Sequence, residues 1–72
     1  MACTPDEDHD VILRECQGTW EIWVGDELHG LRYTLESALE RARAVATVLR
    51  RPAWLLDETG RPLELIQPDT LH

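Results

Sequence analysis

The residues best suited to binding a metal lie near the start of the chain. Cys3, His9 and Cys16 supply thiol and imidazole groups, and Asp6, Asp8 and Asp10 supply carboxylates. These are ligand types that zinc accepts. Structural zinc sites usually contain closely spaced pairs such as C-x-x-C or H-x-x-x-H, and this chain has neither. We therefore expect a solvated acidic tail with an incidental thiol, and we predict no metal and no other cofactor.

Nucleophilic catalysis would need a thiol close to a base, and Cys16 with His29 is a pair of the right types. The sequence around Cys16 lacks a nucleophile elbow and any cysteine-enzyme signature. Neighbouring carboxylates occur at 26–27 and 57–58, but both pairs fall in predicted turns. Acid–base catalysis needs a desolvated carboxylate, which so short a chain has little room to enclose. We predict a protein that is not an enzyme and identify no small-molecule substrate.

Length and composition predict one small folded domain. The chain has 72 residues, of which 43% are hydrophobic. We expect an acidic tail over residues 1–9, a single domain over 10–67 and a short tail over 68–72. A chain this short buries only about 60–65% of its unfolded surface, so its core should be marginal.

The net charge is −7, from 14 acidic and 7 basic residues. This charge repels phosphate backbones and anionic lipid, so we expect neither nucleic-acid nor membrane binding. It favours basic partners. The first ten residues lack the basic and apolar segments of a signal peptide. We expect a cytoplasmic protein.

Two patterns of hydrophobic spacing divide the domain. A period of three to four residues predicts one helix, with Thr34 as N-cap or Ser37 as the alternative, and Pro52 beyond its end. The residues on its apolar face are Leu35, Ala38, Leu39, Ala42, Val45, Ala46 and Leu49. Short β-rich runs separated by turn residues predict the strands 11–16, 20–24, 28–33, 53–56 and 63–66.

The order of elements is therefore β-β-β-α-β-β. Short turns predict an α+β fold in which one helix packs on one face of an antiparallel sheet of four or five strands. Alternation along a strand places Trp20 and Trp23 on opposite faces. If Trp20 faces the helix, Trp23 faces away from it.

The same alternation predicts a second apolar surface that no helix covers. We assign to it Ile12, Trp23, Leu55 and Ile66. Large apolar patches and exposed tryptophan mark interfaces. We expect a non-enzymatic interaction module that forms a homodimer or receives a protein partner through this face or an edge strand. The alternative is that these residues are scattered and are shielded by the tails and by long side chains such as Arg14.

Arginines along the helix suggest a second function. Arg41, Arg43, Arg50 and Arg51 lie on the helix or at its end, and Arg32 precedes it. A nucleic-acid-linked regulatory protein would use these cations, or would mimic nucleic acid through the chain's acidic surface. Glu36 and Glu40 dilute the patch, which favours a solvated helix face.

The run over residues 20–46, followed by the run over 54–66, resembles small uncharacterised bacterial proteins. In that pattern a tryptophan-led hairpin leads into T-x-x-x-A-x-x-x-A and a closing hairpin with a glycine turn. The matching positions here are Trp20, Thr34, Ala38, Ala42 and Gly60. The resemblance covers about two-thirds of the chain and implies a compact α+β fold in a bacterial protein, without an activity.

Overall fold

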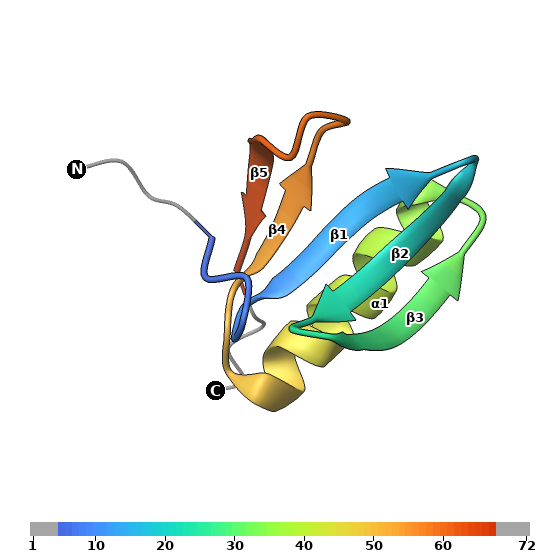
Figure 1. The fold of residues 1–72 in the computed structure, drawn as a ribbon. Helices are drawn as coiled ribbons and strands as arrows, with labels where there is room; N and C mark the ends of the chain where they lie inside the picture. The colour runs from blue at the N-terminus through green and yellow to red at the C-terminus, as the bar shows by residue number, and fades with distance from the viewer. Residues whose placement is uncertain (1–4, 68–72) are drawn as a thin grey trace.

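A computed structural model describes residues 5–67 and shows a five-stranded sheet with one helix against one face (Figure 1). The elements follow the predicted order: β1 (Val11–Cys16), β2 (Thr19–Val24), β3 (Glu27–Arg32), α1 (Leu35–Leu49), β4 (Ala53–Leu56) and β5 (Pro62–Ile66). The α+β class is confirmed, and α1 is the one helix within residues 5–67.

Local signals explain where the elements begin and end. The β1–β2 loop consists of Gln17 and Gly18, whose φ angles are 52° and 81°. Two consecutive positive φ angles are what a two-residue hairpin turn of type I′ requires. Thr34 Oγ1 accepts a hydrogen bond from the main-chain N–H of Ser37 at 3.2 Å, which confirms Thr34 as the N-cap. The helix ends at Arg50, which adopts a left-handed conformation and donates its N–H to Ala46.

The sheet order is β3-β2-β1-β4-β5. The prediction of a purely antiparallel sheet is wrong, because β1 and β4 make the sheet mixed. β1 and β4 are parallel, whereas the three hairpin pairs are antiparallel. The reason is the connection through α1. A helix that crosses a face returns the chain to the end from which the previous strand started, so β4 runs parallel to β3 and therefore to β1.

The main core lies between the sheet and α1. Val11, Leu13 and Ile22 are fully buried on the sheet side. The helix contributes small residues with no exposed surface, namely Ala38, Ala42 and Ala46. Small side chains let α1 approach the sheet closely, so the core between the two layers is densely packed. Trp20 packs against this core and Trp23 against the other face, so the predicted opposition of the two tryptophans is confirmed.

The predicted N-terminal tail contains an ordered turn. The main-chain N–H groups of His9 and Asp10 both donate to the carbonyl of Asp6, at 3.1 and 2.7 Å. Asp6 also forms an ion pair with Arg51 at 3.4 Å. Residues 6–10 are therefore tied to the domain. Residues 1–4, which include Cys3, and the predicted tail over 68–72 lie outside the described residues.

A matched pair of leucines tests how much the small core contributes. Leu13 is fully buried, whereas Leu63 is 64% exposed. We expect Leu13→Ala to lower the free energy of unfolding by about 2–5 kcal/mol, because it leaves a cavity under the helix. Leu63→Ala should change it by less than about 0.5 kcal/mol. Urea unfolding followed by tryptophan fluorescence measures both values. Equal losses would contradict this assignment of the core.

Candidate functional site

An apolar row crosses the whole sheet on the side opposite α1, which we call the helix-free face. Trp23 in β2 lies directly opposite Ile12 in β1 and Leu28 in β3. Ile12 in turn pairs with Trp54 in β4, and Trp54 pairs with Leu65 in β5. Cross-strand partners project to the same face. Leu28, Trp23, Ile12, Trp54 and Leu65 are therefore successive cross-strand neighbours from one edge of the sheet to the other.

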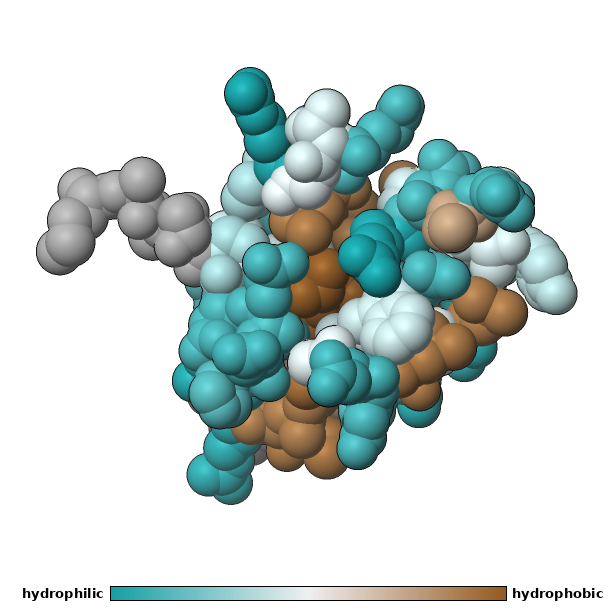
Figure 2. Space-filling view, viewed as in Figure 1, coloured by the Kyte–Doolittle hydropathy of each residue, from teal (hydrophilic) through white to brown (hydrophobic). Residues whose placement is uncertain are grey.

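The apolar row is buried in the middle and exposed at its ends. Ile12 and Trp54 are 4% and 7% exposed, and with Leu56 they form a cluster separate from the main core. Trp23 is partly buried and packs against this cluster. The side chains that end the row, Leu28 and Leu65, are 49% and 41% exposed. Figure 2 looks onto this face and shows brown side chains in a hollow between teal ones.

Two charged side chains cover Trp23 and neutralise each other. The Arg14 guanidinium carbon lies 5.4 Å from the centre of the Trp23 ring, within the range of a cation–π contact. Trp23 Nε1 donates to Glu21 Oε1 at 3.0 Å, and Arg14 Nε lies 3.7 Å from the same oxygen. The polar atoms on this part of the face are thus paired within one chain. The shielding by Arg14 that the alternative interpretation expects is present, but it covers only this part of the row.

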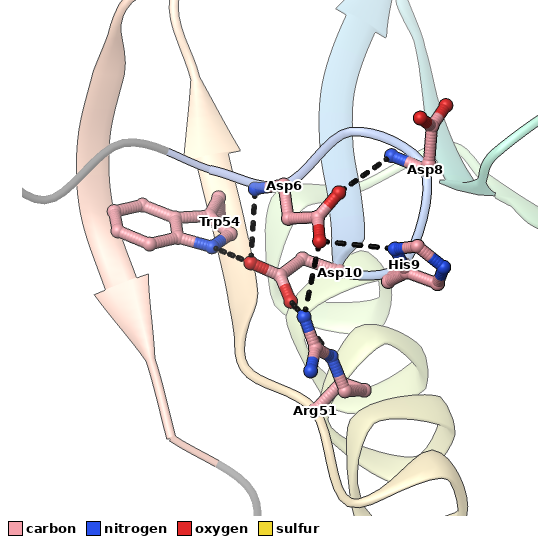
Figure 3. Close-up of polar contacts among 6 residues, drawn as sticks. All are labelled: Asp6, Asp8, His9, Asp10, Arg51 and Trp54. Atoms are coloured by element: carbon pink, nitrogen blue, oxygen red, sulfur yellow. Dashed lines mark hydrogen bonds and ion pairs between the residues drawn. The ribbon is translucent and has the colours of Figure 1, made fainter.

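A buried carboxylate joins the start of β1 to β4 and to the end of the helix (Figure 3). Asp10 is only 4% exposed. Its Oδ2 accepts from Trp54 Nε1 at 2.9 Å, and its Oδ1 lies 3.0 and 2.7 Å from the Nε and Nη2 of Arg51. The N–H of Asp6 also donates to Oδ2, at 3.1 Å. A buried carboxylate is costly unless it is paired, and these donors meet that requirement.

Asp6 extends this cluster to the surface. Its Oδ2 lies 3.0 Å from His9 Nδ1, and its Oδ1 accepts from the N–H of Asp8 at 3.2 Å. The hydrogen bond from His9, with that from Asp8 and the charges of His9 and Arg51, lowers the pKa of Asp6 below its usual value. Because these oxygens and donors bind one another, the cluster holds the N-terminal turn against Trp54 rather than presenting a reactive group.

The structure separates the four residues that the sequence assigns to the second surface. Ile12 and Trp23 do lie together on the helix-free face. Leu55 and Ile66 do not, and their placement there is corrected. Both belong to the main core under the helix, because parallel pairing sets Leu55 beside Leu13 and antiparallel pairing sets Ile66 opposite Ala53.

Sequence reasoning missed three members of the apolar row, namely Trp54, Leu28 and Leu65. Alternation correctly puts Trp54 and Leu56 on one face and Leu55 on the other. It does not say which face meets the helix, because the pairing of β4 with β1 decides that. Asp10 stands out in the sequence only as a polar residue directly before an apolar strand. Its partners Arg51 and Trp54 are 41 and 44 residues away, so the sequence does not indicate that it is buried and paired.

The remaining candidates from the sequence are the Cys16–His29 pair, the metal ligands and the helix arginines. Cys16 is exposed at the end of β1, and His29 lies on β3 near Glu27. Since β2 lies between these strands, their backbones are roughly 10 Å apart. Within residues 5–67, no three His, Cys, Asp or Glu side chains are placed to hold a metal ion. Of the helix arginines, Arg41 donates to the His29 carbonyl and Arg51 binds Asp10.

No protein-family model matches this chain, and neither does any curated protein or solved structure. The resemblance to small bacterial proteins therefore stays a prediction. Among residues 5–67, no helix combines the length and apolar character needed to cross a bilayer.

Removing the buried carboxylate should destabilise the fold. Asp10→Ala leaves the Trp54 indole N–H and the Arg51 guanidinium without their acceptor, so we expect a loss of about 2–3 kcal/mol in the free energy of unfolding. Asp26→Ala removes an exposed aspartate from the β2–β3 turn and should cost less than about 0.5 kcal/mol. Urea titration of both variants makes the comparison. An Asp10→Ala protein as stable as the Asp26→Ala protein would contradict a structural role for the cluster.

The lowered pKa of Asp6 predicts a specific acid dependence. A carboxylate whose pKa is depressed by folding contributes stability above its unfolded pKa, and this contribution is lost as the pH falls through its folded pKa. Asp6→Asn should therefore make stability fall less steeply below about pH 4. Asp8→Asn removes an equal charge from the same turn but keeps the acceptor, and it should retain the wild-type profile. Thermal unfolding across acidic pH distinguishes the two.

Proposed function

We propose that this protein is a non-enzymatic interaction module that self-associates by packing the helix-free faces of two copies together. The observation that carries the proposal is the apolar row, which reaches both edges of the sheet while α1 lies on the other side. A sheet that faces water on one side normally alternates apolar with polar residues. Here the helix-free face instead carries Trp23, which is only partly buried and belongs to a residue type enriched at interface hot spots. Trp54 lies on the same face but is already buried within one chain, so it supports Trp23 from below.

Exposed leucines at both sides of the helix-free face offer apolar contact surface to a second copy. A standard interface removes about 800 Å² from each partner, which is roughly 15% of the 5292 Å² surface of this chain. Leu28, Leu31 and Leu65 expose 49%, 43% and 41% of their surfaces. The first two lie in β3 and the third in β5, so apolar surface is available along both sides of the face. Packing against a flat partner would cover all three.

The charge on this face also permits two like molecules to meet. In β1 and β2, Arg14 and Glu21 are the charged residues that project to this side, and they pair with each other. The charge of Asp10 is balanced by Arg51. The net charge of −7 therefore arises mostly elsewhere. Two helix-free faces would approach with less repulsion than the net charge alone suggests.

Sedimentation equilibrium over a concentration series tests self-association. We expect a monomer–dimer equilibrium, weakened about 30-fold by Trp23→Ala if Trp23 is a hot spot worth about 2 kcal/mol. Trp20→Ala removes an indole from the opposite face and serves as the control. It should cost on the order of 3 kcal/mol of folding stability, yet association of the folded fraction should change little.

Two results would contradict the proposal. One is a monomeric mass at every concentration reached. The other is a dimer that Trp23→Ala leaves unchanged, which would move the contact away from the helix-free face to an edge strand or the helix. Circular dichroism of each variant confirms that the compared molecules are folded.

A further inference from the structure

The central strand β1 and its neighbour β4 are paired along only part of their length. β1 and β4 are paired only where Val11–Leu13 meets Ala53–Leu55. β1 continues to Cys16, and its last three residues pair with β2 alone. Figure 1 shows the β4–β5 hairpin leaning away from β1 beyond this point. Main-chain groups at the end of β1 therefore face a gap where a neighbouring strand would normally lie.

A cleft of about 160 Å³ occupies this gap, and we call it the β1–β4 cleft. Three apolar residues and three carboxylates line it: Trp20, Leu56, Leu63, Glu15, Asp57 and Glu58. Leu63 is 64% exposed, because the β4–β5 register shifts at this point and pairs Leu56 with Pro62 instead. The cleft is smaller than typical small-molecule sites of about 300–1,000 Å³, so it suits a single long side chain.

No basic residue lines the cleft, although the charge of the neighbouring Arg61 acts on Asp57. Among residues 5–67, no arginine or histidine forms an ion pair with Glu15, Asp57 or Glu58. Asp57 Oδ1 accepts from the hydroxyl and N–H of Thr59 and the N–H of Arg61, which fixes the β4–β5 turn. The Thr59 hydroxyl and these N–H groups lower the pKa of Asp57 below its usual value.

We propose that the β1–β4 cleft binds an extended segment of a partner protein that carries a lysine or arginine. The main chain of the segment would pair with the free edge of β1, which is the β-strand addition by which many domains bind peptides. The stem of its basic side chain would lie along Trp20 and Leu56, and its cation would meet Glu15 and Glu58. Long basic side chains suit such a site because their stems are apolar and their ends charged.

Charge complementarity selects this occupant over a second copy of the chain. A partner of net charge −7 would meet the three carboxylates with repulsion, whereas a basic segment is attracted to them. The β1–β4 cleft shares Leu56 with the cluster on the helix-free face but is otherwise a separate surface. Its occupation does not depend on self-association, so either proposal stands if the other fails.

Titration of ¹⁵N-labelled protein with a defined peptide tests the cleft. The probe is an acetylated and amidated heptapeptide of alternating valine and arginine, with the peptide containing citrulline in place of arginine as its neutral match. We expect saturable shifts of the Trp20 indole and of the main-chain amide of Glu15, because the N–H of Glu15 lies on the β4 side of β1 as that of Val11 does. The amides of the outer strands β3 and β5 should move less.

A matched pair of double variants tests the charges. Glu15→Gln with Glu58→Gln should weaken binding of the arginine peptide about five- to tenfold, because each exposed ion pair contributes a small amount. Glu36→Gln with Glu40→Gln removes the same charge from exposed positions on α1. This control should keep the dissociation constant within about twofold at physiological salt, where distant charges are screened.

Several results would overturn the proposal. Equal binding of the citrulline peptide would remove the role of the cation. The largest shifts on β3 or β5 would move strand addition to an outer edge. Spermidine binding as tightly as the peptide would show that the cleft recognises cations without a main chain. Amide spectra of both double variants verify that their folds are intact.

Discussion

The architecture depends on a short parallel contact between β1 and β4. The β1–β2–β3 meander and the β4–β5 hairpin are each held together by local antiparallel pairing, but only three residue pairs join them into one sheet. Those pairs set Leu13 beside Leu55 under the helix and Ile12 beside Trp54 on the helix-free face. Both apolar clusters therefore cross this junction. A shift by one residue would exchange the two faces of β4 and disrupt both clusters.

So short a junction needs support, and the polar cluster of Asp6, Asp10, Arg51 and Trp54 supplies it. Asp10 directly precedes β1, Arg51 lies between α1 and β4, and Trp54 is on β4. The carboxylate binds both partners, so it fixes the start of β1 relative to the start of β4. The main-chain bond from Val11 to the carbonyl of Pro52, at 3.0 Å, acts at the same place. The two strands are tied at one end and separate at the other, which explains why the β1–β4 cleft opens where it does.

Features encoded by neighbouring residues could be predicted, whereas those set by distant contacts could not. Thr34 marks the helix start by its own hydroxyl, and Gly60 has the positive φ expected of a turn glycine. Trp20 and Trp23 lie on opposite faces because strand alternation requires it. The face occupied by Leu55 was predicted wrongly because it depends on a parallel partner about 40 positions earlier. The same dependence hid Trp54 from the candidate surface.

The distribution of charge gives the two sides of the junction different chemistry. Around Trp23, one arginine and one glutamate neutralise each other and leave an apolar row of nearly zero charge. Around Leu56 and Leu63, three carboxylates border an apolar floor with no basic residue among those lining the cleft. Apolar contact between like molecules is favoured where charge is balanced, and contact with a basic molecule is favoured where it is not. If two copies associate through the helix-free face, the β1–β4 cleft of each copy stays beside the dimer contact. The dimer would then present two sites for basic segments. Their combined affinity for one partner would depend on the distance between the two sites.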